Sequence, residues 1–475
     1  MSIVEQTKNS VDMFEIRVDM LEGRDALFDL RLPCQTIYSF RPKRQGGVYR
    51  GEEKERLDFL TEIARAIPYS YIDLEYDVPT DVFFEINKHS NTICSYHNYA
   101  GRINEEQLHM AFKKPSEIVK VAFVPVTVKE IFECIMTVPR LKKERNNVIL
   151  IGMGGMGQWT RILGSFLNSP WTYVSVSHKY QTAEGQLTLN EALNIYRLHE
   201  IDLSFSVYGI IGKPLEHTIS PIIHNFAFKE MGYQAVYVPF EIDSCHDFFN
   251  YINSFIPLRG LSVTIPFKQE IIPVMGMVDE EAWSIGSINT IRWQEGNWVG
   301  YNTDYNGFIN PLLNVRNPEG LRVLLIGAGG AAAAVAFALK KHNARVTVTN
   351  RNFKRASELA RKFKLDVIKW EDRHQFEYDI LVNATPSGML PDSESSPIEL
   401  TNVEGKIIYD LVYNPIKTAM LKEAEEKGAI ILNGLDMLIE QAVEQLNIWI
   451  GRSPSKHILK EAANAYLQSS SFDLF

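Results

Sequence analysis

A lysine lies inside an apolar segment of the chain, IVKVAFVP, where a charged side chain is unusual. A strand built from valine, alanine and phenylalanine desolvates Lys120, which favours the neutral amine that attacks a carbonyl carbon. His97 follows a second apolar segment, ICSY, and a histidine at a neighbouring strand end can carry protons for such a reaction. The pair predicts Schiff-base chemistry, and the alternative is a lysine that snorkels at a strand edge.

Further polar side chains fall within or at the ends of other apolar segments. Glu15 and Arg17 alternate within FEIRVD and therefore face the same side of a strand. Arg41 ends TIYSF, and Glu75 ends YIDL. For Glu15 and Arg17 taken alone, an ion pair beside solvent is the better explanation. Together with Lys120 and His97, the four residues predict one polar site.

A glycine-rich turn later in the chain predicts a dinucleotide site. Gly327, Gly329 and Gly330 follow a short apolar strand, and the alanines after them allow close packing of a helix on a sheet. The second strand ends in Asn350 and Arg351, where an NAD site carries an acid, and Arg355 follows one helical turn later. Two guanidinium groups there predict a 2′-phosphate and hence NADP. A structural turn with a surface arginine pair is the alternative.

A third group of polar residues precedes this turn. Lys268 follows a strand in GLSVTIPFK, and Asp304 lies in GYNTDYNG. On two loops that face one substrate, a lysine and an aspartate can relay a proton during ketone reduction. Ser220 begins a helix whose first turn holds Pro221, so it is also explained as a helix N-cap.

The elements that must position these residues are repeated βα units. In the first half, helical patterns alternate with apolar segments that we predict as strands. Such a layout brings strand ends to one mouth, as in a (β/α)8 barrel of the TIM type. Seven strands are visible, so we expect a barrel that lacks its first strand, and they are Phe14–Val18, Gln35–Phe40, Ser70–Leu74, Thr92–Tyr96, Val119–Val124, Val148–Ile151 and Trp171–Ser177.

A new pattern begins at Val207, and we predict three domains in all. The barrel takes residues 1–203, and a second domain takes 204–303 and is completed by helices from 439–475. A Rossmann domain takes 304–438, so that the second half has two lobes and a cleft. The chain is thus predicted to be an α/β protein.

The first half also contains a misleading glycine motif. Gly152, Gly154 and Gly157 fit G-x-G-x-x-G better than the turn at Gly327 does. The helix that follows is cut short by Pro170, and the next segment ends without an acid or an arginine pair. We therefore assign this motif to a barrel strand and its loop.

Bulk properties exclude several classes of function. The chain has 475 residues, a net charge of −9 and 45% hydrophobic residues, which argues against a nucleic-acid partner. No apolar run is long enough for a membrane span, the four cysteines lack metal-ligand spacing, and no targeting segment is evident at Met1. We expect a cytoplasmic protein that acts on small molecules and binds no metal.

The segments of the first half resemble the type I 3-dehydroquinate dehydratases from about Asp12 to Asn190. The similarity is carried by EIRVD, SFRPKRQGG, YIDLEYD, SYHNYAGR, VKVAFVP, TRILGSF and TAEGQ. The resemblance implies that Lys120 forms an imine with the substrate ketone, that His97 shuttles protons and that Glu75 orients His97. It further implies that the substrate is held by Glu15, Arg17, Arg41, Arg161, Thr182 and Gln186, with Arg161 on its carboxylate. The family usually carries a strand and a helix before EIRVD, where this sequence has only Met1 to Phe14.

The second half resembles shikimate dehydrogenase from about Val207 onward, through the segments named above and NATPSGM, YDLVYNP and GLDMLIEQA. The resemblance implies a catalytic pair of Lys268 and Asp304. It implies that substrate is bound by Thr218, Ser220, Asn289 and Gln441. It also implies that NADP lies across Gly327, Ala328, Gly329, Gly330, Ala331, Asn350, Arg351, Arg355, Thr385, Tyr413, Gly434 and Met437.

Together the two resemblances imply consecutive reactions, in which 3-dehydroquinate is dehydrated to 3-dehydroshikimate and NADPH then reduces this product to shikimate. Two alternatives stay open. The first half could be a degenerate scaffold without activity, which the absent first strand suggests and the retained Lys120 opposes. The chain could also be a catabolic quinate/shikimate dehydrogenase that uses NAD, which Arg351 and Arg355 oppose.

Overall fold

The computed structural model describes residues 7–24, 27–28, 32–141 and 147–468. The chain forms two compact units. Among the described residues, the first comprises those up to 204 together with 239–256, and the second comprises 205–238 and 257–468. Within the first unit, α9 (Cys245–Tyr251) packs on α5 (Val128–Leu141).

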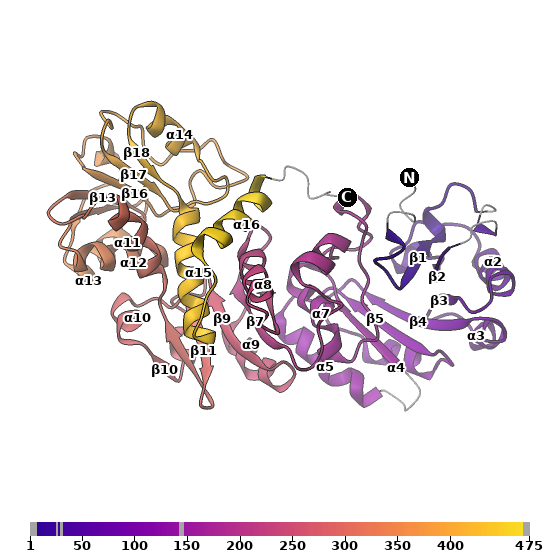
Figure 1. The fold of residues 1–475 in the computed structure, drawn as a ribbon. Helices are drawn as coiled ribbons and strands as arrows, with labels where there is room; N and C mark the ends of the chain where they lie inside the picture. Colours follow the sequence, from indigo (N-terminus) through magenta and orange to yellow (C-terminus); the bar gives the residue numbers. More distant parts are fainter. Residues whose placement is uncertain (1–6, 25–26, 29–31, 142–146, 469–475) are drawn as a thin grey trace. The chain divides into compact units, whose positions relative to one another are not determined.

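The first unit contains six parallel strands whose spatial order follows the sequence (Figure 1). They are β1 (Met13–Arg17), β2 (Gln35–Ser39), β3 (Tyr71–Glu75), β4 (Asn91–Asn98), β5 (Ile118–Phe123) and β6 (Asn147–Gly152). The connecting helices are α2 (Glu53–Ala66), α3 (Thr80–Ile86), α4 (Glu105–Lys113) and α5, and short helices follow β6 at α6 (Gly154–Gly157) and α7 (Trp159–Ile162). Consecutive parallel strands with helical crossovers are the arrangement of a TIM-type barrel.

The inner face of this sheet forms one apolar cluster that draws on all six strands. Ile37, Ile93 and Ile149 belong to it, and Trp171 and Tyr173 pack against it from beyond β6. Side chains of distant strands share one core only when the sheet curls, as a partly closed barrel does.

The predicted seventh strand, Trp171–Ser177, is wrong. In the structure this segment makes one isolated parallel bridge, from Ser175 to Thr188, and is not part of the six-stranded sheet. Pro170 directly precedes the segment and has no backbone N–H to donate to a ladder. The segment instead contributes its aromatic side chains to the core.

The second unit begins with a mixed six-stranded sheet of order β10-β12-β11-β9-β7-β8. Its strands are β7 (Ser206–Gly212), β8 (Ala235–Glu241), β9 (Leu258–Val263), β10 (Met277–Val278), β11 (Thr290–Gln294) and β12 (Asn297–Tyr301). Three helices cover it, namely α8 (Ser220–Glu230), α15 (Gly434–Ile450) and α16 (Lys456–Gln468). Trp449 of α15 donates its indole N–H to the carbonyl of Ile291, at 2.9 Å. The end of the chain therefore completes this lobe.

The other lobe of the second unit is a parallel six-stranded sheet of order β15-β14-β13-β16-β17-β18. Its strands are β13 (Arg322–Ile326), β14 (Arg345–Thr349), β15 (Asp366–Val367), β16 (Ile380–Asn383), β17 (Ile407–Asp410) and β18 (Ile430–Leu432). Its helices are α11 (Asp304–Val315), α12 (Gly330–Lys341), α13 (Phe353–Phe363) and α14 (Ala419–Glu426), while α10 (Glu280–Ile285) lies near α12. The strand order reverses at β13, and doubly wound sheets bind ligands at the carboxyl ends of the strands there.

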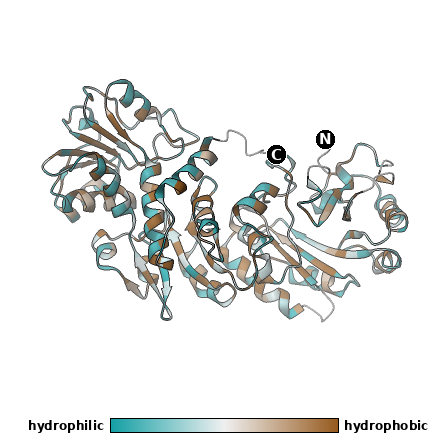
Figure 2. Ribbon diagram, viewed as in Figure 1, coloured by the Kyte–Doolittle hydropathy of each residue, from teal (hydrophilic) through white to brown (hydrophobic). Residues whose placement is uncertain are grey.

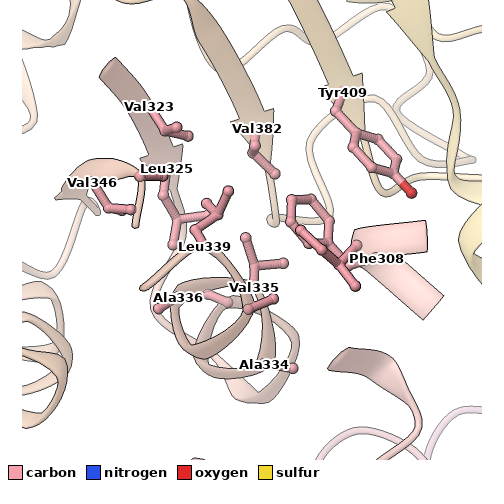
Figure 3. Packing of buried hydrophobic residues seen from close by; sticks show 14 of the residues in the cluster. Phe308, Val323, Leu325, Ala334, Val335, Ala336, Leu339, Val346, Val382 and Tyr409 are labelled. Carbon is pink, nitrogen blue, oxygen red and sulfur yellow. The ribbon is translucent and has the colours of Figure 1, made fainter. Parts of the chain in front are cut away.

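Alanines explain how closely α12 approaches this sheet. Figure 3 shows Ala334, Val335 and Ala336 packed beneath Leu325 and Val382, with Phe308 of α11 beside Tyr409. A helix face of methyl groups lets the helix axis lie near the strands. The first turn of α12 is thereby fixed beside the end of β13.

Hydropathy follows the same layering (Figure 2), because the strands are largely apolar and the helices alternate between apolar and polar residues. Among the described helices, none combines the length and the apolar character that a bilayer crossing requires.

Candidate active sites

A polar pocket lies in the first unit at the carboxyl ends of the strands. Every site residue predicted for this half except Glu75 lines it. The lining residues that carry polar groups are Glu15, Arg17, Arg41, His97, Tyr99, Lys120, Arg161, Tyr173, Thr182 and Gln186. Because these residues come from β1, β4 and β5, from the segments directly after β2 and β4, and from the chain after β6, only the folded sheet brings them together.

Lys120 is buried within this pocket, and its ammonium group contacts the carboxylate of Asp73. The same carboxylate oxygen accepts a hydrogen bond from Arg41 at 2.9 Å. Burial by itself raises the pKa of Asp73, but the charges of Lys120 and Arg41 outweigh it and hold the pKa well below its usual range. Asp73 is therefore ionised, and this carboxylate contacts Nζ of the lysine that the sequence predicted to react.

His97 lies beside the same cations. Burial lowers its pKa well below the ordinary value, and the charges of Arg41 and Lys120 lower it further, so the imidazole is neutral. A guanidinium N–H of Arg41 lies 3.1 Å from Nδ1 of His97. Since a guanidinium only donates, Nδ1 accepts, and the proton of the neutral ring is on Nε2.

Glu75 does not take the position expected of it. Its carboxylate pairs with Arg56 at 2.8 Å and lies 3.9 Å from Arg41. Arg41 is thus the group that lies within hydrogen-bonding distance of His97, and Glu75 lies beside Arg41. The reason is the burial of Arg56, a helix residue of α2 that turns inward and also donates to the carbonyl of Phe40.

The remaining predicted residues form the opposite wall of this pocket. Gln186 accepts hydrogen bonds from the backbone and hydroxyl of Thr182, at 2.9 and 3.3 Å. Arg161 is buried, and its Nε has no hydrogen-bond partner among the described residues. Burial lowers the pKa of Arg161 to about 10, and Glu15 partly opposes this change. A desolvated guanidinium without a carboxylate partner is suited to bind an anionic ligand.

The glycine motif after β6 serves packing. A Cβ atom on Gly152 would lie 2.6 Å from Cα of Gly157, and a Cβ on Gly157 would lie 2.3 Å from the carbonyl carbon of Gly152. Two backbones this close leave no room for side chains, which explains the glycines without any nucleotide.

In the second unit, Lys268 and Asp304 form an ion pair at 2.5 Å. Asn289 fixes the aspartate, because its Nδ2 lies 2.8 Å from Asp304 Oδ1. The same nitrogen lies 2.9 Å from Thr303 Oγ1 and 3.1 Å from Oε1 of Gln441. Four residues predicted from the sequence to act on one substrate, Lys268, Asp304, Asn289 and Gln441, therefore lie in one hydrogen-bonded cluster.

The hydroxyl residues of this lobe are joined to one another. Thr218 donates to Ser220 Oγ at 3.2 Å, and the backbone N–H of Ser220 donates to Thr218 at 3.3 Å. Burial raises the pKa of Tyr413, which a hydrogen bond with Thr218 partly offsets. Behind them, Gln445 joins Ser262, His224 and Thr290, at 2.9, 3.1 and 3.0 Å.

The predicted nucleotide turn connects β13 to α12. Gly327 has φ +125°, and a Cβ on it would lie 2.7 Å from the carbonyl oxygen of Ala384. Gly329, by contrast, has no atom within 4 Å of a built Cβ. Ala328 and Ala331 are half-buried beside them. The turn is therefore tightly packed at Gly327, on the side of the sheet, and open at Gly329, where α12 begins.

Three comparisons with known proteins identify the family. The family model described as Type I 3-dehydroquinase matches residues 1–202, and that of the shikimate dehydrogenase substrate binding domain matches 210–291. Models of Shikimate / quinate 5-dehydrogenase and of the Shikimate 5'-dehydrogenase C-terminal domain match 313–397 and 434–463. The chain is 33% identical over 493 residues to a bifunctional 3-dehydroquinate dehydratase/shikimate dehydrogenase, chloroplastic, of Arabidopsis thaliana, covering 96% of this chain and 80% of the relative.

The chain belongs to the bifunctional 3-dehydroquinate dehydratase/shikimate dehydrogenase family. Its second half is also 40% identical to a shikimate dehydrogenase (NADP(+)) of Shouchella clausii, over 55% of this chain and 98% of the relative. A crystal structure of shikimate 5-dehydrogenase from Thermus thermophilus in complex with NADP(H) and shikimate superposes on 55% of this chain and 99% of its own. Its identity is 34% and its TM-score 0.51. The first half is accordingly the dehydratase half, and the second is the NADP-dependent dehydrogenase half.

The dehydrogenase half fits the NADP of its family. The open space over Gly329 and the free backbone N–H groups of the first turn of α12 suit a pyrophosphate. Beside this turn, the hydroxyl of Ser287 is buried and has no partner among the described residues. Arg351 and Arg355 are exposed at the start of α13, and neither has an acidic partner in the part of the chain that the structure describes. These two cations suit a 2′-phosphate.

The other predicted NADP residues surround the carboxyl end of this sheet. Asn350 donates to the carbonyl of Asn352, at 3.1 Å. Thr385 donates through its backbone and its hydroxyl to Asn383, at 3.0 and 2.6 Å. A Cβ on Gly434 would lie 2.1 Å from the carbonyl oxygen of Leu411, and Met437 is buried on the next turn of α15.

Sequence reasoning missed several residues of the dehydratase pocket. Asp73 is the most prominent, and its signal was the alternation of two acids in YIDLE. Tyr99 is another, since its ring stacks on His97 with centroids 6.4 Å apart and its hydroxyl donates to the carbonyl of Gln45 at 3.3 Å. Gly46 permits this contact, because a Cβ there would lie 2.0 Å from the Tyr99 hydroxyl.

Proposed function

We propose that the residues of the two sites carry out the two family reactions in sequence. The dehydratase pocket converts 3-dehydroquinate into 3-dehydroshikimate through an imine at Lys120, and the dehydrogenase site reduces this product to shikimate with NADPH. The gathering of Lys120, His97, Arg41 and Arg161 in one pocket supports the proposal most directly, since a scaffold without activity has no use for so many buried ionisable groups at its centre.

In the dehydratase pocket, Arg161 binds the substrate carboxylate, and Glu15, Arg17 and Gln186 bind its hydroxyls. Nζ of Lys120 attacks the C3 carbonyl, and the iminium that forms acidifies the hydrogen on C2. His97 removes this hydrogen and protonates the hydroxyl that departs from C1. Water then releases Lys120 and the product.

The hydrogen bond between Arg41 and His97 restricts this proton transfer. The ring nitrogen that can accept a proton is Nδ1, and it already accepts a hydrogen bond from Arg41 at 3.1 Å. A base must have an open acceptor atom, so Arg41 has to turn from Nδ1 toward the substrate before His97 acts. Arg41 thus couples substrate binding to the release of the base.

In the dehydrogenase site, Thr218, Ser220, Asn289 and Gln441 hold the hydroxyls and the carboxylate of 3-dehydroshikimate. When bound along Gly327–Ala331, Thr385, Tyr413 and Met437, NADPH supplies a hydride to the C3 carbonyl. Nζ of Lys268 donates a proton to the carbonyl oxygen as that oxygen gains negative charge, and Asp304, 2.5 Å away, holds Lys268 in position.

The test is to give the purified chain 3-dehydroquinate and NADPH with no other enzyme and to follow NADPH absorbance. A steady loss of NADPH is the expected result, because the 3-dehydroshikimate made at the first site is the substrate of the second. If NADPH persists while added 3-dehydroshikimate is reduced, the dehydratase half is inactive and the scaffold alternative stands.

A cytoplasmic location and small-molecule substrates remain part of the proposal. The Arabidopsis relative is named as chloroplastic, so the site of action of this chain calls for its own measurement, by fractionation of cells that express it.

A further inference from the structure

Asp73 has a central position that the proposed chemistry of the dehydratase pocket has not yet used. It lies in β3 with no exposed surface, and its Oδ2 contacts both Nζ of Lys120 and Nη2 of Arg41. Its other oxygen, Oδ1, accepts a hydrogen bond from Ser95. Lys120 lies in β5, Ser95 lies in β4 and Arg41 follows β2, so three neighbouring parts of the sheet hold the carboxylate in place.

The aromatic ring of Tyr173 is a second partner of the lysine. Nζ of Lys120 lies over this ring, 5.0 Å from its centroid. The reacting nitrogen therefore contacts the carboxylate of Asp73 and also faces a π system, and both partners stabilise positive charge at Nζ.

A buried ion pair of this kind is a poor source of stability. The desolvation of two charges offsets most of their attraction, and apolar residues of similar volume often stabilise a core equally well. An ionised carboxylate that touches the imine-forming nitrogen is better explained by the reaction than by the fold.

We propose that Asp73 is the counter-ion of the reacting nitrogen, which it holds first as the ammonium and then as the iminium of the substrate adduct. This role rests on the proposed function of the pocket. The overall step joins an ammonium to a ketone and gives an iminium and water: two of the three N–H hydrogens leave with the carbonyl oxygen, and one remains on nitrogen. The charge at Nζ is +1 before and after, so one carboxylate balances it throughout.

The hydrogen that remains on the iminium nitrogen also has a defined partner. Oδ2 of Asp73 is the acceptor that Nζ already contacts, and the N–H of the iminium points to it. A planar C=N bond held at this end can rotate little, so Asp73 sets which face of the substrate meets His97.

Several charged or titratable groups face this pair, and any pH effect must be measured against them. They come from β1, β2, β3, β4, α7 and the segment after α7, and they are Glu15, Arg17, Arg41, Glu75, His97, Arg161 and Tyr173. Since all of them remain in an Asp73 variant, a change in its pH profile reports the loss of the Asp73 charge.

The test compares Asp73→Asn with the wild-type chain, with Asp77→Asn as a matched control because Asp77 is partly exposed and pairs with Arg44. Two quantities are measured from pH 5 to 9. One is the turnover of 3-dehydroquinate. The other is the fraction of the chain that carries a stable adduct at Lys120 after borohydride has reduced the iminium, read by mass spectrometry. In Asp73→Asn we expect turnover to fall at least 100-fold and trapping at pH 7 to fall at least 10-fold. The pH profile of trapping should also differ from that of the wild type, because Nζ has lost the carboxylate that it contacts.

Reduction of added 3-dehydroshikimate serves as the internal control for the intact second unit. A wild-type chain that neither dehydrates the substrate nor traps at Lys120 contradicts the proposed function itself. A wild-type chain that does both, beside an Asp73→Asn chain with the same turnover and pH profile, overturns only the role of Asp73. If Asp73→Asn lacks the wild-type thermal transition, Asp73→Glu replaces it: this variant keeps the charge, and loss of trapping despite an intact transition contradicts the counter-ion role.

Discussion

Two glycines of the turn between β13 and α12 should respond differently to substitution by alanine, one by losing stability and the other by losing affinity for NADPH. Gly327→Ala places a Cβ 2.7 Å from the carbonyl oxygen of Ala384, on a residue with φ +125°. This φ value is almost restricted to glycine, and such strain costs about 1–3 kcal/mol even before the contact is relieved. We expect the second unit to lose about 2–4 kcal/mol of unfolding free energy, which lowers its Tm by roughly 5–10 °C.

Gly329→Ala adds the same methyl group at φ −94°, where no atom lies within 4 Å. The Tm without ligand should therefore stay within about 1 °C of wild type, because neither strain nor a clash arises. The methyl group occupies the space that we assign to the pyrophosphate, so NADPH should bind at least 10-fold more weakly, a loss of about 1.4 kcal/mol or more.

Scanning calorimetry with and without NADPH, together with a fluorescence titration of the cofactor, measures both effects. Turnover of 3-dehydroquinate should be unchanged in either variant, since both residues lie in the second unit. Wild-type affinity for NADPH in Gly329→Ala would refute the assigned cofactor position. An unchanged Tm in Gly327→Ala would refute the strain at that turn.

Three further predictions concern single residues. Arg351→Ala should weaken NADPH binding far more than NADH binding in parallel titrations, and equal losses would exclude the 2′-phosphate contact. Lys120→Ala should abolish dehydration while the reduction of added 3-dehydroshikimate continues, and residual dehydration above a few per cent of wild type would exclude imine catalysis. Burial lowers the pKa of His224 from 6.5 to about 4, so the unfolded chain binds the proton first as pH falls. The contribution of neutral His224 to the free energy of unfolding is fully present above pH 6.5 and should be lost toward pH 4, a decline of about 3 kcal/mol in denaturant titrations. The decline should be smaller in His224→Gln, and an equal decline in that variant would show that His224 is not its source.

Much of the dehydratase pocket could be predicted from local patterns. Lys120, His97 and Arg41 each lie within or directly after a short apolar segment, and parallel strands bring their carboxyl ends together whatever the details of packing. The prediction of a strand at Trp171–Ser177 was wrong because strands share their apolar alternation with extended segments whose side chains only fill a core.

The acids of YIDLE pointed to Asp73 and Glu75, but the sequence could not predict which of them contacts Lys120. Lys120 pairs in register with Ser95, and Ser95 pairs with Glu75, so a flat sheet would bring Glu75 level with Lys120. Strands in a curled sheet are tilted against its axis, and side chains two strands apart therefore meet out of register. The tilt brings Lys120 to Asp73, and the tilt depends on packing across the whole unit.

The dehydrogenase site shows the same division. The turn at Gly327 and the basic residues Arg351 and Arg355 follow from spacing alone. The bonds from Thr385 to Asn383 depend on how the loop after β16 returns to its own strand, which only the folded chain defines.

Asn289 has a consequence for which substrates the dehydrogenase site accepts. Its Nδ2 carries two hydrogens but lies within bonding distance of three oxygens, on Thr303, Asp304 and Gln441. The longest of the three separations is the one to Gln441, whose Oε1 otherwise has only a 3.4 Å contact with Nε2 of Gln445. In the proposed function a ring hydroxyl of the substrate supplies a shorter hydrogen bond to this oxygen, and an analogue without that hydroxyl should bind more weakly. Selection for a hydroxylated ring thus arises from a shortage of donor hydrogens within the protein itself.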